Sequence, residues 1–366
     1  MNIRDRKVTI GICLYNGEPF IAAALKSALA QTHENIEMLV YNDGSRDGGP
    51  SIVRSFSDPR LELIDAPQNR GVGFGRNHLV EARAQGDYVT WLDQDDLFDR
   101  DRVERLLKTA VASDADITID SYRMIDKAGA PLAGTMCVPD RIAADRHFTR
   151  LFERNAMLPH PLIHKRCFKT AKYDVTMKGS DDYDLWLKCS YAGMTFARSP
   201  DIGLSYRVRE SSLSKNHRRN REETKIILEK YEIPKLAALY RERGFSDAHI
   251  NYMRCLQHLF RGQYEEALAA ASEPWPDEPE VDQDFYRASL LLRNGKPNEA
   301  RAPLERHLAR SPKSPGGHNN LGVLTRLLGG DGSPHFTRAA EFLPGYLDAK
   351  QNLADRTSTH ITDTQI

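Results

Sequence analysis

Apolar runs alternate with amphipathic stretches along the first 120 residues. Nearly continuous apolar segments predict buried strands at 8–14, 36–41, 61–64, 88–92 and 117–119. Apolar positions at helical spacing predict helices at 19–31, 76–84 and 100–112, with a short helix after Gly49. Strands alternating with helices imply right-handed crossovers and a mainly parallel sheet. The first part of the chain is therefore predicted to be an α/β domain.

Polar residues follow three of these strands directly. Tyr15 comes after the first strand, Asp43 after the second and Asp93 after the fourth. Ligands of open α/β sheets bind at the carboxyl ends of the strands, near a switch in strand order. Three such signals together favour one functional site at this edge of the sheet over three unrelated turns.

Three carboxylates crowd the end of the fourth strand, at Asp93, Asp95 and Asp96. Burying unpaired carboxylates is costly, so the cluster is expected at a solvated strand end where a cation neutralises it. Mg²⁺ and Mn²⁺ take oxygen ligands and bridge carboxylates to substrate phosphates. Taken alone, the run favours a solvated acidic turn that caps the following helix. The other motifs of the chain are needed to decide between this acidic turn and a site for a metal ion and a diphosphate.

A second acidic group opens a predicted helix after Ser180. Asp181, Asp182 and Asp184 suit a helix N-terminus with Ser180 as its cap, but three carboxylates beside Trp186 exceed what capping requires. A carboxylate at a helix start that faces a cleft is able to act as a general base. Further on, the predicted strand 204–209 carries Arg207 and Arg209, which either face a phosphate or are ordinary surface cations. The segment 211–221 after it is polar and basic, and is expected to be mobile.

Two other motifs do not support a ligand site. The glycines Gly71, Gly73 and Gly75 predict a flexible loop, because the third comes one residue too early for a dinucleotide-binding fingerprint. The pair His160 and His164 has a helical metal-site spacing, but the intervening proline argues against a helix. We expect these histidines to be hydrogen-bonded within the protein or to face solvent.

The last third of the chain contains a helical repeat. Gly262 and Ala267 recur as Gly295 and Ala300, each 33 positions on, and a third copy with an insertion spans 320–353. The small residues let paired helices pack closely, and three leucines are predicted to fill the interfaces: Leu259, Leu292 and Leu328. A period near 34 resembles tetratricopeptide repeats, whose curved arrays usually bind peptides or partner proteins. A structural extension that shields the first domain or forms a dimer is the alternative. A polar tail, expected to fray, follows.

Composition narrows the classes of function. Charged residues make up 28% of the 366 positions and balance to a formal net charge of zero, so neither nucleic acid nor an anionic membrane is demanded as a partner. With a mean hydropathy of −0.55 and a charged N-terminus, neither a transmembrane segment nor a signal peptide is expected. The five scattered cysteines are expected to be reduced thiols of a cytoplasmic protein.

The ordered set of motifs resembles family 2 glycosyltransferases of the GT-A fold. The motifs stand at 14–17, 42–47, 75–77, 91–96, 181–186, 206–207 and 211–214. Each is weak alone, but their order along the first ~220 residues is specific. The resemblance implies an inverting transfer of a sugar from a nucleotide-sugar donor, with UDP favoured, to a hydroxyl of a glycan, lipid-linked or protein acceptor. It also implies a divalent cofactor, Mn²⁺ or Mg²⁺, and a location in the cytoplasm or peripheral at the inner face of the membrane.

The resemblance also assigns roles to individual residues. Asp182 is the expected catalytic base, and Asp95 with Asp93 the expected metal ligands. The remaining candidates bind the nucleotide sugar (Leu14, Tyr15, Asn16, Asp43, Arg76, Asp93, Gln94) or contact acceptor or phosphate (Asp96, Asp181, Trp186, Arg207, Arg209).

This chain departs from the family pattern at two positions that matter. Asp181 stands where the family usually has glutamate, and Arg209 where it often has a histidine. An arginine is unable to ligate a cation, so it would instead neutralise phosphate directly.

The predicted layout is a GT-A domain at 1–218, a connecting helix at 219–247, tetratricopeptide-like repeats at 248–354 and a polar tail at 355–366. Two alternative functions remain to be compared with sugar transfer. In the first, the sheet domain is a catalytically weak nucleotide-sugar-binding scaffold whose repeats recruit a protein partner or self-associate. In the second, the chain is a nucleotidyltransferase on a similar sheet. This hypothesis is weakened because the first strand is not followed by a glycine-rich loop that contains Arg or Lys.

Overall fold

A computed structural model describes residues 2–138, 147–153, 155, 157, 159–209, 217–278, 281–355 and 357–363. The predicted 211–214 motif, and with it the first part of the basic segment 211–221, lies outside these residues. The chain divides into two compact units, Met1–Thr224 and Lys225–Ile366, and each is described by itself.

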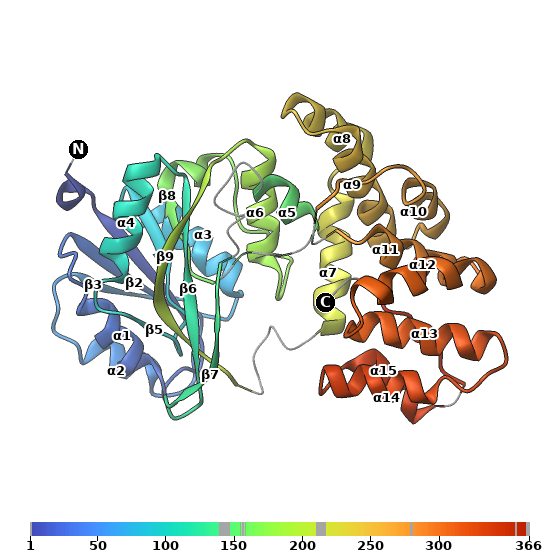
Figure 1. Cartoon of the computed structure of the whole chain (residues 1–366). Helices are drawn as coiled ribbons and strands as arrows, with labels where there is room; N and C mark the ends of the chain where they lie inside the picture. Colours follow the sequence, from blue (N-terminus) through green and yellow to red (C-terminus); the bar gives the residue numbers. More distant parts are fainter. Residues whose placement is uncertain are drawn as a thin grey trace. The chain divides into compact units, whose positions relative to one another are not determined.

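The first unit contains a nine-stranded sheet and most of the helices shown in blue to green in Figure 1. Its strands are β1 (Val8–Leu14), β2 (Ile36–Asn42), β3 (Leu61–Asp65), β4 (Tyr88–Trp91), β5 (Leu97–Phe98), β6 (Ile117–Ile125), β7 (Pro131–Met136), β8 (Leu162–His164) and β9 (Phe196–Arg207). Its helices are α1 (Ile21–Leu29), α2 (Gly49–Arg54), α3 (Val72–Ala82), α4 (Arg102–Ser113), α5 (His147–Glu153) and α6 (Asp181–Tyr191), and α7 (His217–Glu229) contains the boundary between the units.

The strand order is β3-β2-β1-β4-β8-β6-β9-β5, with β7 pairing with β6. The four strands from β3 to β4 are mutually parallel, so their carboxyl ends meet at one edge. The strand β8 is antiparallel to both β4 and β6, whereas β6 and β9 are again parallel. The predicted α/β class is confirmed, and the switch from β1 to β4 places the predicted polar residues at the ligand-binding edge of such a sheet.

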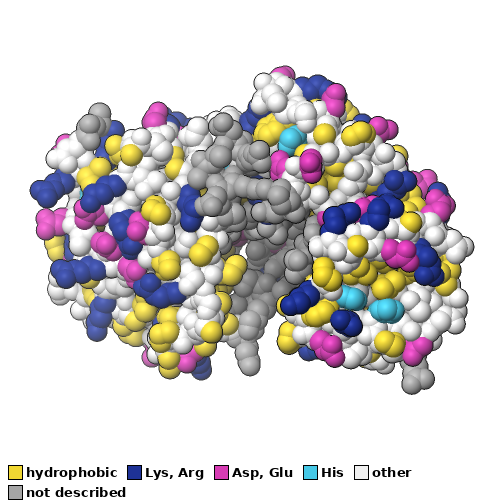
Figure 2. Space-filling view, viewed as in Figure 1, with side chains coloured by type: hydrophobic (Ala, Val, Ile, Leu, Met, Phe, Trp, Pro, Cys, Tyr) yellow, Lys and Arg dark blue, Asp and Glu magenta, His cyan; other side chains and the backbone are white. Residues whose placement is uncertain are grey.

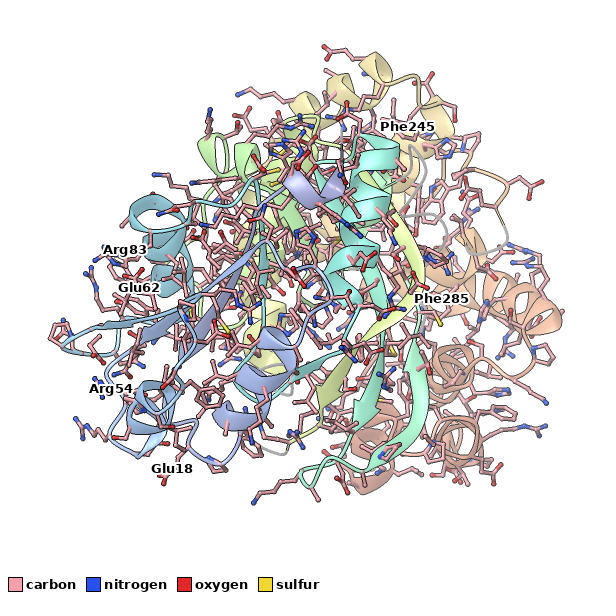
Figure 3. All side chains as sticks on the ribbon, turned by 90° about the vertical axis from the view of Figure 1, so that its left-hand side faces the viewer. Glu18, Arg54, Glu62, Arg83, Phe245 and Phe285 are labelled. Atoms are coloured by element: carbon pink, nitrogen blue, oxygen red, sulfur yellow. The ribbon has the colours of Figure 1, made fainter. Side chains whose placement is uncertain are left out.

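Apolar burial explains why the central strands were readable from sequence. Val8, Ile10, Ile12 and Leu14 on β1 are fully buried and belong to one core cluster with Leu25 of α1. Strands covered on both faces read as continuous apolar runs rather than alternating ones. The outer strand β3 is only partly buried, and its Glu62 forms an ion pair with Arg83 at 3.7 Å, beside it in Figure 3.

The glycine segment after β3 was predicted to be a loop, and this is wrong. Helix α3 begins at Val72, and the left-handed Gly71 (φ 90°) is its N-cap. A Cβ on Gly75 would lie 2.8 Å from the Tyr41 ring and 2.9 Å from Cys13 Sγ. Glycine is therefore present because the helix packs closely on β1 and β2, not because the backbone needs freedom.

The second unit is built from helices. They are α8 (Ile233–Glu242), α9 (Asp247–Phe260), α10 (Tyr264–Ala270), α11 (Gln283–Arg293), α12 (Pro297–Arg310), α13 (Pro315–Leu327), α14 (Ser333–Phe342) and α15 (Leu347–Ala354). The helix expected at 219–247 is instead α7, α8 and the start of α9. A proline at Pro234, in the first turn of α8, suits a new helix start but not a helix interior.

Three consecutive helix pairs carry the repeat: α9–α10, α11–α12 and α13–α14 (Figure 1). Gly262, Gly295 and Gly329 adopt left-handed φ values of 73°, 67° and 84° at the turns within these pairs. The alanines Ala267 and Ala300 are fully buried between helices, as their small size predicted. Leu259 and Leu292 are also buried, but Leu328 is 38% exposed. The prediction that Leu328 fills an interface is wrong, because it caps the end of α13.

The chain after α15 does not fray over its described residues. Thr362 is 2% exposed, and Asp363 forms an ion pair with Arg293 of α11 at 2.6 Å. Within the described residues, every helix is too short or too polar to cross a membrane. Basic and acidic side chains are interspersed on the visible face of each unit in Figure 2, in line with the balanced charge of the sequence.

Candidate active site

Reciprocal amide hydrogen bonds join the loops that follow β1 and β4. The Gln94 side chain accepts from the backbone N–H of Tyr15 at 2.9 Å and donates to the Tyr15 carbonyl at 3.1 Å. The Tyr15 ring itself is 46% exposed. Gln94 thus fixes the backbone beside Leu14 while leaving an aromatic surface open to stack on a ligand.

The loops after β1 and β2 are tied together in the same way. Asn16 has a left-handed φ of 49°, donates its backbone N–H to Ser45 Oγ and accepts from the Arg46 backbone through Oδ1. Glu18 accepts from the backbone N–H of Gly48 at 2.9 Å. Glu18 is labelled in Figure 3. These bonds make the edge of the sheet a preformed surface rather than a set of loose loops.

Asp43 is buried and accepts two backbone hydrogen bonds at the start of α3. The donors are the N–H groups of Arg70 and Gly71, at 2.7 and 2.9 Å. Each carboxylate oxygen keeps a free lone pair for one further donor, such as a nucleobase imide. Asp43 therefore positions α3 whatever else it binds.

Arg76 of α3 connects the two acidic groups predicted from the sequence. Its guanidinium lies 3.4 Å from Asp93 Oδ1 and 3.5 Å from Asp181 Oδ2, and it faces the rings of Trp91 and Tyr173. Its side chain is 12% exposed. One buried cation thus holds the end of β4 and the start of α6 at the same place.

Asp93, Asp96 and His160 form a compact group of ligand-type side chains. One ligand atom from each lies within 4.8 Å of the others. His160 Nε2 is 3.0 Å from Asp96 Oδ2 and 3.8 Å from Asp93 Oδ2. Two carboxylates and an imidazole are a donor set that Mn²⁺ accepts, so the residues present fit a divalent ion.

His160 was not predicted to be a site residue. It is buried with a left-handed φ of 61°, and its carbonyl accepts from Thr90 Oγ1 and from the Arg102 guanidinium. The expectation of a satisfied histidine is met, but its partner is the acidic cluster itself. The proline after it excluded a helical metal face correctly, and only a loop brings the imidazole to Asp96.

Asp95 is paired with Arg209, the arginine at the position where the resemblance leads us to expect a histidine. Arg209 Nε lies 2.5 Å from Asp95 Oδ2. Burial raises the pKa of Asp95 to about 6, the neighbouring carboxylates Asp93 and Asp96 add to this, and Arg209 opposes it. The assignment of Asp95 as a metal ligand stays a prediction, and it requires Arg209 to move aside or to share the carboxylate.

Arg207 holds the same acidic loop from β9. Its backbone N–H donates to Asp96 Oδ1 at 2.8 Å, and its side chain donates to the Asp95 carbonyl at 2.7 Å. The side chain also donates to the carbonyls of Asp126 and Lys127. Through these hydrogen bonds Arg207 fixes the conformation of the acidic loop. Its contact with a phosphate stays a prediction and would have to form alongside them.

The carboxylates of Asp181 and Asp182 stand at the start of α6. Burial raises the pKa of Asp181 to about 6 although Arg76 lowers it. Burial likewise raises the pKa of Asp182 against the opposing effect of Arg76. Asp184 is fully buried and paired with Lys188, and Trp186 is 2% exposed. Of this motif, Asp181 and Asp182 are the carboxyls whose pKa values respond to the charges of Arg76 and Asp93.

The structure therefore brings together most of the predicted side chains. Arg76 links the Asp93 and Asp181 motifs, Gln94 links Tyr15 to the same loop, and Arg207 and Arg209 both contact it. Trp186 is buried, and its predicted contact with acceptor or phosphate stays a prediction. The added residue is His160.

Comparison with known proteins gives a consistent picture for the first unit. Residues 9–173 match the family model described as Glycosyl transferase family 2. The succinoglycan biosynthesis protein ExoO of Rhizobium meliloti is 29% identical over 284 residues, which cover 72% of this chain and 80% of ExoO. The glycosyltransferase GlyA of Streptococcus pneumoniae is 30% identical over 227 residues, but they cover 32% of GlyA.

Solved structures share the fold at low sequence identity. Staphylococcus aureus TarS 1–349 in complex with UDP-GlcNAc superposes with a TM-score of 0.55 at 16% identity, covering 84% of this chain and 92% of that one. The mannosyltransferase PcManGT of Pyrobaculum calidifontis, in complex with GDP-Man and Mn²⁺, gives 0.51 at 18% identity, covering 84% of this chain and 86% of that one. The GT-A architecture predicted for this chain is confirmed.

Proposed function

We propose that this chain, whose residues 9–173 match family 2 glycosyl transferases, transfers a sugar from a nucleotide-sugar donor to an acceptor hydroxyl with inversion at the anomeric carbon. The observation that carries the proposal is the position of Arg76, between Asp93 at the end of β4 and Asp181 at the start of α6. Arg76 thereby holds the start of α6, which carries the proposed base, close to the acidic end of β4.

The donor would lie along the carboxyl edge of β2, β1 and β4. Tyr15 offers an exposed ring for the nucleobase, and Asp43 offers acceptor oxygens to an imide N–H, which favours uracil. Arg76 would position the nucleotide side of the site. TarS and PcManGT were solved with UDP-GlcNAc and GDP-Man respectively, which supports a sugar nucleotide but leaves a UDP-linked donor as our choice.

The diphosphate would lie at the acidic loop with a divalent ion, Mn²⁺ or Mg²⁺. Asp93, Asp96 and His160 present a ready donor set, and Asp95 is the further carboxylate that the family resemblance assigns. Such an ion, when bound, stabilises the negative charge that builds on the departing diphosphate. Arg209 would add a fixed positive charge on the same side.

Asp182 would accept the proton of the attacking hydroxyl. A general base works best when its pKa lies near the working pH, and burial moves the pKa of Asp182 upward in that direction. Arg76 opposes this rise. A single displacement from the face opposite the diphosphate inverts the anomeric configuration.

The acceptor is proposed to be a growing glycan or another glycoconjugate of the bacterial surface. The support is the likeness to a succinoglycan biosynthesis protein over most of both chains. The repeat unit, proposed to be tetratricopeptide-like, would recruit a partner or the acceptor. The competing scaffold hypothesis is disfavoured because Asp93, Asp182 and Arg76 are all present and organised.

Donor hydrolysis tests the proposal without a known acceptor. The chain would be incubated with UDP-, GDP- and dTDP-linked sugars, with Mn²⁺, with Mg²⁺ and with EDTA. Release of nucleoside diphosphate from one donor class, lost with EDTA, is the expected result. Metal-independent UDP binding with no turnover of any donor would favour the scaffold.

A further inference from the structure

The described end of the chain lies outside any helix or strand, along α11, α13 and α15. Residues 360–363 contact α11, α13 and α15, whose contributing side chains we call the asparagine face. They are Arg293, Asn319, Asn320, Asp348 and Asn352, and we include Ser289, which accepts a hydrogen bond from Asn320. The three asparagines and Ser289 are fully buried.

Two asparagines each bind both backbone polar groups of one residue. Asn320 donates to the carbonyl of Thr362 at 2.9 Å and accepts from its N–H at 2.8 Å. Asn352 makes the same pair with His360, at 2.9 and 2.7 Å. The two residues held are two positions apart, which is the spacing at which an extended chain repeats its orientation. These contacts recognise the main chain and do not depend on which side chains the bound segment carries.

Two further contacts do read side chains. The Thr362 hydroxyl donates to Asp348 Oδ2 at 2.9 Å, and it lies within hydrogen-bonding reach of Asn319. Arg293 holds Asp363 through two parallel bonds at 2.8 and 2.6 Å, the geometry that favours a carboxylate. A hydroxyl residue followed by an acidic residue is therefore the preferred sequence.

The backbone of α13 is adapted to this close approach. A Cβ placed on Gly316 would lie 3.1 Å from Thr362 Cγ2 and 3.1 Å from the Phe285 ring. The asparagines support one another as well, since Asn352 donates to Asn319 Oδ1 at 2.9 Å and Asn320 donates to Ser289 Oγ at 2.9 Å. The asparagine face is therefore a preorganised polar surface whose side-chain amides donate to the backbone of residues 360–363.

We propose that the asparagine face is a binding site for an extended peptide segment of another protein, with a hydroxyl residue followed by an acidic one, and that residues 360–363 occupy it as an intramolecular stand-in. The tail is held mainly by hydrogen bonds and one ion pair, which an incoming segment reproduces bond for bond. The tail acts at a high effective concentration, so it sets a threshold that a partner must exceed. This inference concerns the second unit and does not depend on the proposed transfer reaction.

A fluorescent peptide copying residues 357–366 is the probe, titrated into the full chain and followed by anisotropy. We expect weak binding to the native chain and at least about tenfold tighter binding to the full chain carrying Thr362→Pro, which removes the N–H held by Asn320 and the hydroxyl. Asp363→Ala, which breaks only the Arg293 contact, is the milder second variant. Thermal unfolding checks that both remain folded.

Main-chain reading is tested by methylating single amides of the probe. Methylation at the position of Thr362 should weaken binding by about tenfold or more, because it removes the N–H that Asn320 accepts. Methylation at the position of Ile361, whose N–H these asparagines do not hold, should have a much smaller effect. In the chain, Asn352→Ala should abolish probe binding, and Asn298→Ala on the exposed surface of α12 should not.

Three results would overturn the proposal. Absence of probe binding to both tail variants would make residues 360–363 a structural strap. Equal loss from methylation at either amide would show that the asparagines do not read main chain. A concentration-dependent dimer of the native chain that Thr362→Pro dissociates would assign the segment to a second copy.

Discussion

The Nε2 atom of His160 lies 3.0 Å from Oδ2 of Asp96, although 64 positions separate the two residues. Both are buried, and Asp93 completes the group with its oxygen 3.8 Å from the same nitrogen. A loop on the edge of the antiparallel strand β8 brings the imidazole to the end of β4. The acidic cluster at the sheet edge is therefore not purely a carboxylate site.

Replacing His160 by asparagine should weaken Mn²⁺ binding by at least about tenfold, the loss typical when a metal site loses a supporting group. Asparagine is the suitable substitute because it tolerates the left-handed φ of 61° found here. Calorimetry with Mn²⁺ and UDP measures the change. His164→Asn is the matched control, since His164 caps a short helix with its side chain and an asparagine caps equally well. Equal losses in both variants would remove His160 from the metal site.

Asp182→Asn should reduce donor hydrolysis by a factor on the order of 10²–10⁴, because the base that accepts the proton is lost. UDP binding should stay unchanged, since the nucleotide is held at the β1 and β2 ends. Asp114→Asn is the control, at a left-handed position at the end of α4 where asparagine is well tolerated. Undiminished turnover in Asp182→Asn would sink the base assignment.

The pH profile of hydrolysis follows from the raised pKa values. Burial raises the pKa of Asp95 and of Asp181 to about 6, and raises that of Asp182 as well. The base acts only when ionised, so the rate should fall as the pH drops into the range where Asp182 binds a proton, which burial places above the roughly 3.9 of an ordinary aspartate. A flat profile between pH 5 and 8, measured with saturating donor and Mn²⁺, would contradict the ionisation scheme.

The same shifts predict how stability depends on pH. A carboxyl whose folded pKa is raised binds its proton more tightly in the native state, so its contribution to stability is present at low pH and lost as the pH rises through about 6. Asp95→Asn should therefore stabilise the metal-free chain at pH 8 relative to the native protein, and the difference should shrink by pH 5. Thermal unfolding in EDTA at the two pH values measures it.

Two glycines of one helix should respond in opposite ways to alanine. At Gly75 a Cβ would lie 2.8 Å from the buried Tyr41 ring, so Gly75→Ala should destabilise the chain by about 1–3 kcal/mol. At Gly73 the nearest atoms are at 3.5 Å, so Gly73→Ala should be neutral or stabilising by up to about 1 kcal/mol. Denaturant unfolding compares the two. Destabilisation by Gly73→Ala to the same degree would show that α3 does not need the close approach at Gly75 specifically.

The central parallel strands β1, β2 and β4 were predictable because they are buried on both faces, whereas the exposed β7 and the short β5 and β8 carry no such signal. The first strand was predicted at 8–14 and is observed there as β1, since a run of buried apolar residues has one interpretation at that length. The start of α3 was missed because three glycines in five residues look like a loop, and only the distances to Tyr41 and Cys13 show why a helix needs one of them.

The site was predictable where residues follow strands and not where a long-range contact brings them in. Asp93 and Asp95 could be placed at the sheet edge from the strand before them. His160 could not, because nothing near Pro161 in sequence indicates Asp96 as a neighbour. The tail misled for the same reason, since its polar composition suggests fraying, whereas buried Asn319, Asn320 and Asn352 bind its backbone.

Arg209→His introduces the residue that the resemblance to family 2 glycosyltransferases leads us to expect at this position, and it distinguishes the two candidate sets of metal ligands. The guanidinium now lies 2.5 Å from Asp95 Oδ2, where it repels a divalent ion and occupies a ligand oxygen. A neutral imidazole removes that charge and offers a ligand nitrogen. We expect Mn²⁺ affinity at pH 8 to rise by about tenfold, while UDP binding in EDTA falls because a cation facing the diphosphate is lost.

Arg83→His is the control for that experiment, because the partner of Arg83 among the described residues is the half-exposed Glu62 of the edge strand β3 (Figure 3). If Arg209→His leaves Mn²⁺ affinity unchanged while His160→Asn lowers it, Asp95 is not a ligand, and the ion is held by Asp93, Asp96 and His160. In that case the Asp95–Arg209 pair has a different role. Arg209 faces the diphosphate, and Asp95 fixes the orientation of the Arg209 side chain. Loss of UDP binding in EDTA on Asp95→Asn would then be the matching result.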